Sequence, residues 1–456
     1  MSDRKEGAAR MPAERLNLLD DLLAKAKRAG AESADAVMVE SASLSVAWRM
    51  GTLERLERAE NADIGLRVFI GKRQACVSSS DRSAMALDTL VERCVAMARN
   101  VPEDPFCGLA EPGQLATGAP PDLDTLDPSE PTAETLIDQV RRAEDAARAV
   151  PGITNSEGAE AGWGRSHMAV AATNGFHHAW SGTSSSISVA VLAGEGTAME
   201  RDTDSSSVVW REDLRAPEDI GHAAAHRAVA RLNSRKLRTC KVPVVFDPRN
   251  ATGLVGTLAG AINGAAIARG TSFLKDRMDK RVLPAGVHMI DDPHRRRGLR
   301  SKSRDAEGLA NRRRMVVEDG ILTTWFLDLR SARQLGLEST GHASRGTASP
   351  PSPAPTNLYI EKGHVTPGEM ISDIRQGLYI TELIGFGVNT VTGDYSRGAA
   401  GFWIEDGEIA YPVSEITIAG HMSEMFLNLT PANDLVFRYG FDSPTLRIDG
   451  MTVAGR

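Results

Sequence analysis

The histidines set the first limit on the chemistry that this sequence predicts. A zinc hydrolase needs at least two neutral imidazoles on one helix face, and a carboxylate that takes a proton from the zinc-bound water. The usual helical solution is His-Glu-x-x-His, or a relative with one more residue between the histidines. The chain has ten histidines, and none of them is followed by Glu. The ten are His167, His177, His178, His222, His226, His288, His294, His342, His364 and His421. The commonest zinc-binding motif is therefore absent from the sequence.

One pair of histidines keeps a spacing that could hold a metal. His222 and His226 are four residues apart on a helix predicted over 213–235, so both imidazoles could face the same way. The three residues between them are alanines, which supply neither an acid nor a base, and no third ligand is evident nearby. A partly exposed structural pair is the better interpretation, and the two histidines remain weak candidates for a metal site.

Other catalytic motifs are also missing. The sequence contains no Gly-x-Ser-x-Gly and no phosphate-binding Gly-x-x-x-x-Gly-Lys-Ser/Thr. Gly385-Phe386-Gly387 resembles the start of a dinucleotide fingerprint, but Thr390 stands where the third glycine belongs. Four widely spaced cysteines form no Cys-x-x-Cys, which favours reduced thiols over a disulfide framework or a zinc knuckle.

A basic segment could bind a partner. Residues 294–314 carry nine Arg or Lys against two acidic residues. Such a run could bind a carboxylate terminus, an acidic surface or nucleic acid, but a solvated loop is the more frequent outcome. The segment itself contains no aromatic residue, which makes binding of single-stranded nucleic acid less favoured.

The bulk composition describes a globular chain. Its 456 residues predict two or three domains, and 41% hydrophobic and 25% charged residues are ordinary for folded proteins. The net charge of −7 gives no reason to expect a polyanion as partner. No run of 18 apolar residues occurs, and Met1–Arg10 carries both charge signs with no apolar run after it. We therefore expect a cytoplasmic protein without a membrane span or secretory signal.

Hydrophobic periodicity predicts how the elements are arranged. Helices are expected at 13–29, 82–99, 132–149, 213–235, 251–268 and 367–376, and the stretch 34–80 alternates as an antiparallel sheet of about four strands. Further strands are expected at 152–211, 242–246, 413–419 and 444–453, while four prolines exclude regular structure at 348–356. We predict an α+β fold, with antiparallel sheets flanked by helices in the N-terminal half and a mixed, mainly-β C-terminal domain. The predicted domains are residues 1–125 and 126–238, both α+β, and residues 239–456.

Several segments together resemble the TldD/PmbA family, and within it the PmbA (TldE) branch. The most specific is Tyr411-Pro412-Val413-Ser414-Glu415-Ile416-Thr417-Ile418-Ala419-Gly420. Supporting segments lie along nearly the whole chain, at 78–81, 173–176, 191–202, 246–249, 268–274 and 401–405.

The resemblance implies a cytoplasmic heterodimer of two similar subunits, TldD and PmbA, which acts as a metallopeptidase on unfolded or modified peptides. The family's older name, modulator of DNA gyrase, does not require nucleic-acid binding. The catalytic zinc belongs to TldD, whose His-Glu-x-x-x-His follows a strand and opens a helix, with a cysteine near the C-terminus as a further ligand. The corresponding stretch here is Gly256–Ile262, which holds no His and no Glu, and no cysteine follows Cys240.

The resemblance therefore predicts a subunit with no cofactor, no metal site and no catalytic residue of its own, and a zinc-bearing TldD-type partner. Arg269, Thr271 and Ser272 are the candidates for lining a peptide channel, against the alternative that they form a structural turn. Whether the chain is an enzyme by itself is left open. The alternatives are a stand-alone metallopeptidase that uses His222 and His226, and a binding protein that uses the basic segment 294–314. A homodimer is possible when the partner is absent.

Overall fold

The N-terminal half of the chain forms one long antiparallel sheet. The computed structural model describes the backbone of residues 2–455 and the side chains of residues 13–455, so Met1 and the side chains of the N-terminal run 1–10 lie outside the described residues. The sheet order is β3-β2-β1-β4-β5-β6. Its strands are β1 (Ser33–Arg49), β2 (Thr52–Ile70), β3 (Arg73–Ser79), β4 (Ile153–Ala172), β5 (His177–Ala193) and β6 (Glu200–Val208). Because β1 pairs with β4 from Asp35 to Trp48, the two predicted N-terminal domains share one sheet.

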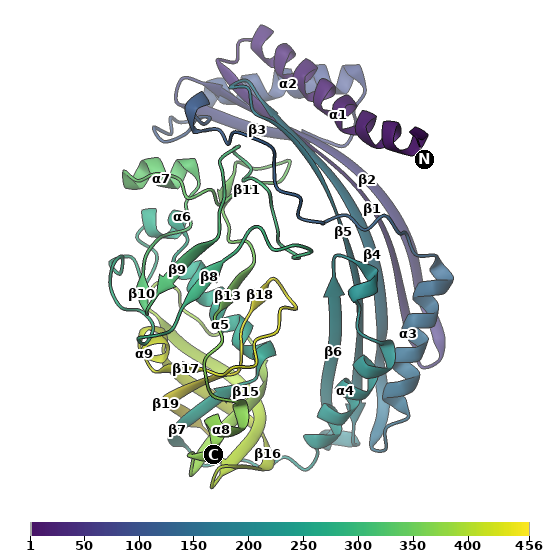
Figure 1. Ribbon diagram of the computed structural model, residues 1–456, viewed down its shortest axis with the longest axis vertical. Coiled ribbons are helices and arrows are strands. Elements are labelled where there is room, and N and C mark those ends of the chain that lie inside the picture. The colour runs from purple at the N-terminus through teal and green to yellow at the C-terminus, as the bar shows by residue number, and fades with distance from the viewer. Residues whose placement is uncertain (1, 456) are drawn as a thin grey trace.

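Four helices cover one face of this sheet. They are α1 (Ser2–Arg28), α2 (Ala84–Asn100), α3 (Ala133–Arg148) and α4 (Pro217–Ala230). One core packs α1 and α2 against Met38 of β1, and a second packs α3 and α4 against Leu44 and Val46 of the same strand. These three residues have the same parity, so they point to the same face of the sheet. Figure 1 shows the strands curving so that their other face is turned toward the C-terminal region.

The stretch 34–80 holds three strands where four were expected. The two short apolar runs at 36–39 and 44–48 belong to the single strand β1, whose pairing with β2 continues without a shift from Ser33 to Ala47. Alternation fades at residues 40–43 because this part of β1 lies between the two helix-covered cores and is only partly buried. The first residues of β2 are exposed, so apolar and polar residues do not alternate there either.

The C-terminal region contains two sheets. The first has the order β16-β15-β14-β7-β19-β17, with an additional pairing of β16 with β19, and the second has the order β10-β9-β8-β13-β18. The strands of the first are β7 (Cys240–Phe246), β14 (Gln376–Ile384), β15 (Asp394–Glu405), β16 (Glu408–His421), β17 (Leu429–Pro431) and β19 (Leu446–Ala454). Those of the second are β8 (Met289–Asp291), β9 (Arg314–Glu318), β10 (Ile321–Leu322), β13 (Leu358–Ile360) and β18 (Phe441–Asp442). Parallel pairing of β7 with β14 makes the first sheet mixed, which confirms the predicted α+β class.

Short helices complete the C-terminal region. They are α5 (Pro248–Ala261), α6 (Gly264–Ala268), α7 (Leu329–Leu335), α8 (Pro367–Ser372) and α9 (Met422–Leu427). The helix expected over 251–268 is divided in two, because Asn263 caps α6 through its side chain and Gly264 packs against Phe326 and Leu327. The proline-rich stretch 348–356 holds only a two-residue strand, β12 (Ser352–Pro353), paired with β11 (Ala343–Ser344).

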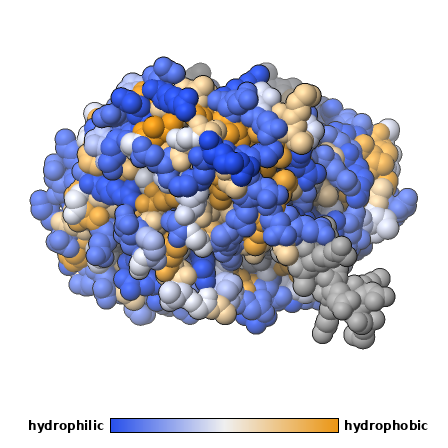
Figure 2. Space-filling model, turned by 90° about the horizontal axis from the view of Figure 1, so that it is seen from above, coloured by the Kyte–Doolittle hydropathy of each residue, from blue (hydrophilic) through white to orange (hydrophobic). Residues whose placement is uncertain are grey.

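The surface shows no extended apolar face in the view of Figure 2. Seen from the end where α1 and α2 lie, hydrophilic residues predominate and apolar patches are separated by polar ones. Among the described residues, no helix combines the length and the low charge that crossing a bilayer requires.

Candidate functional site: a groove between the sheet and the C-terminal region

Three adjoining hollows lie between the curved sheet and the C-terminal region, and we call them together the central groove. The upper hollow has a volume of about 380 Å³, the middle one about 370 Å³ and the lower one about 330 Å³. The upper and middle hollows share Gly298 and Leu299. The middle and lower hollows share Arg438 and Asp442. The groove is therefore long enough to hold an extended segment of another chain.

The sheet wall of the groove consists mainly of small polar residues. Ser41 and Ser43 of β1, Ser166 of β4, and Ser181 and Ser184 of β5 line the upper hollow. Small side chains leave the backbone of the sheet close to any molecule in the groove. This wall can accept chains of different sequence, because it offers few shape-specific contacts.

The free edge of β6 borders the middle hollow. β6 is the last strand of its sheet, and Ser207 and Val208 line that hollow. The Thr203 carbonyl accepts hydrogen bonds from Arg227 Nη2 at 2.7 Å and Arg249 Nη1 at 3.0 Å, so the backbone of Thr203 points away from β5. Backbone groups of alternate residues in an antiparallel strand point the same way, so those of Ser205 and Ser207 also face outward. This edge can add an extended peptide as a further strand.

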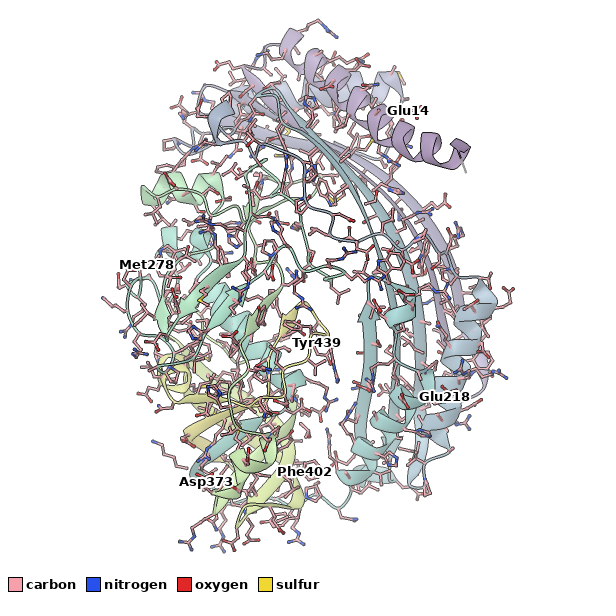
Figure 3. All side chains as sticks on the ribbon, in the orientation of Figure 1. Glu14, Glu218, Met278, Asp373, Phe402 and Tyr439 are labelled. Atoms are coloured by element: carbon pink, nitrogen blue, oxygen red, sulfur yellow. The ribbon has the colours of Figure 1, made fainter. Side chains whose placement is uncertain are left out.

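The opposite wall comes from loops of the C-terminal region and carries arginines stacked on aromatic rings. Arg295 lies 3.4 Å from the ring centroid of Phe437, and Arg297 lies 4.1 Å from that of Trp210, on the other side of the groove. In Figure 3, Tyr439 lies on the side of the C-terminal region that faces β6. The basic segment 294–314 is thus part of a wall rather than a freely solvated loop.

Arg297 fastens this wall to the N-terminal half. Its Nε donates to Asp124 at 2.9 Å, and its Nη1 lies 2.7 Å from Glu212 and 3.1 Å from Asp213. These hydrogen bonds, with Asp124 contributing most, raise the pKa of Arg297. Arg295 and Arg438 differ, because neither makes an ion pair with a side chain in the described part of the chain, although both line the middle hollow.

An ion network lies beside the lower hollow, which Arg227 and Arg249 line. Asp202 of β6 is 2.9 Å from Arg249 Nη1 and 3.2 Å from Arg227 Nε. Arg231 joins Glu200 of β6, at 2.8 Å, to Glu382 of β14, at 2.5 Å. Burial alone would lower the pKa of Arg249, but Asp247 and Asp202 reverse this effect and raise it. The network connects β6 and α4 to the first turn of α5 and to β14.

A second junction lies at the other end of the sheet. Asp35 of β1 is buried and bonds both Arg67 of β2 and Arg345 of the C-terminal region. Burial would raise the pKa of Asp35, but the two guanidinium groups lower it overall. Nearby, burial and the charge of Asp305 raise the pKa of Glu307 well above its usual range. These two sets of ion pairs fix the position of the C-terminal region relative to the sheet.

The structure separates the predicted channel residues from the groove. Arg269 and Thr271 are exposed just after α6, and the Thr271 backbone N–H bonds the Ala266 carbonyl at 3.0 Å. Ser272 is only 2% exposed and its hydroxyl donates to the Ala261 carbonyl, so its side chain has a structural role. None of the three lines the central groove. Contact of Arg269 and Thr271 with a peptide stays a prediction.

The two weak metal candidates lie on α4. His222 and His226 are exposed, and their ring centroids are 6.3 Å apart. Across residues 13–455, whose side chains are described, no group of three or more His, Cys, Asp or Glu is placed to hold a metal ion. The zinc that the family resemblance assigns to the TldD-type partner would find no such set of ligands among these described residues.

Helix α5 carries the stretch to which the resemblance assigns the zinc motif of TldD. One face, which includes Leu254 and Leu258, is buried in the core. The other face presents Gly253 and Gly260, and a Cβ added at either of them would meet nothing within 4 Å. This outward face has room for side chains. It carries Thr257, whose hydroxyl donates to the Gly253 carbonyl at 2.9 Å, but no His, Cys, Asp or Glu.

An exposed phenylalanine marks a feature that the sequence did not predict. Phe386 is 107% exposed at the turn between β14 and β15, with Ile384 and Val391 at 57% and 54%. The Phe273 N–H donates to the Thr390 carbonyl at 3.0 Å, so this loop adjoins the segment that contains Arg269 and Thr271. In the sequence, Gly385-Phe386-Gly387 resembles only the start of a nucleotide motif. An apolar residue flanked by two glycines could have indicated an exposed tip.

The sequence of the chain matches known proteins along most of its length. Residues 34–98 match the first domain, 126–232 the central domain and 239–455 the C-terminal domain of the PmbA/TldA metallopeptidases. The metalloprotease PmbA of Escherichia coli O157:H7 is 39% identical over 95% of this chain and 94% of its own length.

Solved structures with the same fold span almost the whole chain. A putative modulator of DNA gyrase from Bacteroides thetaiotaomicron has a TM-score of 0.88 and 25% identity, covering 97% of this chain and 99% of that protein. TldE from Thermococcus kodakarensis has a TM-score of 0.85 and 19% identity, covering 96% and 100%, which shows a shared fold.

Proposed function

Because the chain belongs to the PmbA branch of the TldD/PmbA family, we propose that it is the PmbA (TldE)-type subunit of a cytoplasmic TldD/TldE metallopeptidase complex. In this complex a TldD-type partner carries the zinc. The present subunit supplies part of the path along which unfolded or modified peptides reach it.

The observation that carries the proposal is the outward face of α5. A peptidase zinc needs imidazole, thiolate or carboxylate ligands and an open position for water. Residues 256–262 contain no such side chain. Gly253 and Gly260 leave open space on this face of the helix, on either side of Thr257. Within residues 13–455, no group of three or more His, Cys, Asp or Glu is placed to hold a metal ion.

The free edge of β6 supports a role in holding peptides. Strand addition uses backbone hydrogen bonds, so it reads little side-chain sequence. The outward-facing backbone of Ser205 and Ser207, beside a wall of small polar residues, suits a substrate of varied sequence. A substrate bound in this way must be unfolded, since a folded domain cannot present an extended strand to a groove of this size.

The exposed loop between β14 and β15 supports the need for a partner. A fully exposed Phe386 flanked by Ile384 and Val391 is costly in water and is typical of protein–protein interfaces. We propose that the TldD-type subunit docks over this loop. A homodimer through the same loop is the alternative when the partner is absent.

Reconstitution tests the proposal. The purified chain should co-elute with a TldD-type subunit in size-exclusion chromatography, and the mixture should cleave an unfolded peptide in a zinc-dependent manner. A partner variant lacking the Glu of its His-Glu-x-x-x-His segment should still co-elute but should not cleave. If the two proteins elute separately and mixing adds no activity, the proposal fails.

A further inference from the structure

The middle hollow of the central groove contains two guanidinium groups that make no ion pair within residues 13–455. Arg295 and Arg438 line it, and neither forms an ion pair with any described side chain. By contrast, Arg297 of the same hollow is paired with Asp124, Glu212 and Asp213. The two unpaired groups come from loops about 140 residues apart in sequence, brought together by the fold.

The acidic residues that line the hollow are already engaged. Asp442 accepts hydrogen bonds from the backbone N–H groups of Arg438 at 2.7 Å, Tyr439 at 2.9 Å and Gly440 at 3.2 Å. Its carboxylate therefore fixes the loop backbone rather than pairing with the Arg438 side chain. Asp213 lies 3.1 Å from Arg297. Neither carboxylate cancels the charge of the two free arginines.

The Arg295 side chain is held in place without being neutralised. Its guanidinium lies 3.4 Å from the ring centroid of Phe437, and that ring packs edge-on against Tyr359 with centroids 4.9 Å apart. A guanidinium that lies over a ring loses rotational freedom, but the N–H donors in its own plane stay available to a planar anion. A bidentate carboxylate is the ligand that matches this geometry best.

We infer that Arg295 and Arg438 form a binding site for a carboxylate of a peptide that lies along the β6 edge. This inference rests on the proposed function for its peptide and names the substrate class: peptides with a free C-terminal carboxylate, or with an acidic side chain, at the position opposite the middle hollow. Ser207 and Val208 of β6 line the same hollow, so backbone pairing and carboxylate recognition can occur on one peptide.

The surroundings favour a peptide over a nucleic acid. A polyanion presents many phosphates in succession, so it would also meet Asp434 of the lower hollow, which a single carboxylate at the two arginines need not approach. The volume of about 370 Å³ suits one carboxylate and its neighbouring residues better than a phosphate backbone. The net charge of −7 also opposes general attraction of nucleic acid.

Direct binding to the full chain, without a partner, tests the inference. Fluorescence anisotropy would compare one short neutral peptide in three forms: with a free C-terminal carboxylate, with a C-terminal amide, and amidated with Glu as the last residue. We expect at least one carboxylate-bearing form to bind about tenfold more tightly than the neutral amide, with affinity falling as salt rises. Which of the two binds identifies whether the chain terminus or an acidic side chain is the ligand.

Variants assign the effect to the two arginines. Arg295→Gln and Arg438→Gln should each weaken binding of the carboxylate form about tenfold and leave the neutral amide unchanged. Arg313→Gln is the matched control, since Arg313 is an exposed arginine of the same basic segment and lines none of the three hollows. Circular dichroism checks that each variant is folded.

Three results would overturn the inference. The first is equal affinity of wild-type chain for the carboxylate and amide forms, which needs no variant. The second is undiminished binding by the folded Arg295→Gln and Arg438→Gln variants. The third is displacement of the peptide by a single-stranded oligonucleotide that itself binds more tightly. None of these results depends on a TldD-type partner, so failure here is distinct from failure of the complex to form.

Discussion

Glu307 is a buried carboxyl near the junction between the sheet and the C-terminal region. One of its oxygens, Oε2, accepts a hydrogen bond from the Leu329 N–H at 2.8 Å. Burial and the adjacent Asp305 raise its pKa above the ordinary value of 4.5. The native state therefore retains this proton at pH values where the unfolded chain has lost it. Its contribution to stability is present at low pH and is lost as pH rises from 4.5 through the raised value.

The Glu307→Gln variant should remove this loss. A neutral amide can still accept from the Leu329 N–H, so the variant should equal wild type at about pH 5 and exceed it by more than about 1 kcal/mol at about pH 9. Urea denaturation across this pH range measures the difference. The exposed Glu318→Gln is the control. Parallel stability curves for wild type and Glu307→Gln would contradict the prediction.

Substitution of Phe386 tests whether the TldD-type partner docks over the loop between β14 and β15. Phe386→Asp should weaken association with a TldD-type subunit by at least about tenfold, because a charge replaces an apolar anchor. It should leave the thermal unfolding temperature of the isolated chain unchanged, since the side chain is 107% exposed. Met85→Asp, at a 78% exposed position on α2, is the matched control. Normal complex formation by Phe386→Asp would place the partner elsewhere.

The surroundings of the basic segment 294–314 could not be predicted from the sequence. A solvated loop is the more frequent outcome for a charge run such as the basic segment 294–314, and the segment has no aromatic residue of its own. In the fold, aromatic rings reach it from Trp210, Phe437 and Phe441. Contacts between residues more than 80 positions apart carry no local signal, so composition could identify the charge of this segment but not its role as a wall.

At the scale of elements, close helix packing gives a further prediction. Gly221 on α4 faces α3, and a Cβ there would lie 2.2 Å from the Ala143 carbonyl oxygen. Gly221→Ala should therefore force the two helices apart and lower the free energy of unfolding by about 2 kcal/mol. Gly253→Ala, on the outward face of α5, meets nothing within 4 Å and should be neutral or stabilising by up to about 1 kcal/mol. Chemical denaturation measures both. If both variants changed the free energy of unfolding equally, helix propensity rather than helix packing would determine the effect of these substitutions.

Periodicity predicted most long elements but not their breaks. The helices expected at 82–99 and 132–149 are α2 and α3 within two residues, because each has a clear apolar face and a Ser or Thr cap. The single helix expected over 251–268 is two helices, since the Asn263 cap was hidden within a run of small residues. The short α7 was missed, although Asp328 and Ser331 form its capping box and Gly336 ends it. Short elements depend on tertiary contacts more than on their own pattern.

At the scale of the whole molecule, the ion network around Asp202 links β6 to the C-terminal region beside the lower hollow of the groove. Asp202→Ala would leave Arg227 and Arg249 without their shared buried carboxylate. Removing one partner of a buried network costs about 3 kcal/mol or more. Hydrogen exchange should increase in β6 and the first turn of α5. The exposed Asp138→Ala serves as control. Unchanged exchange at β6 would show that the network does not determine the groove.

The sequence indicated the α+β class and the absence of a zinc motif, but not the central groove. The groove exists because β1 pairs with β4, which joins two predicted domains into one curved sheet around the third. Such pairing joins residues more than 100 positions apart, and periodicity within each strand does not specify its neighbour. The predicted channel residues Arg269, Thr271 and Ser272 came from the family resemblance, and the groove itself could be found only from the fold.

Metal analysis tests the central claim most directly. The purified chain, the TldD-type subunit and their complex would be dialysed against limiting zinc and measured by plasma mass spectrometry. We predict zinc well below stoichiometric in this chain, and zinc in the complex equal to that of the TldD-type subunit alone. His222→Ala should change none of these values. Stoichiometric zinc in this chain alone, lost on His222→Ala and accompanied by peptidase activity, would contradict the account.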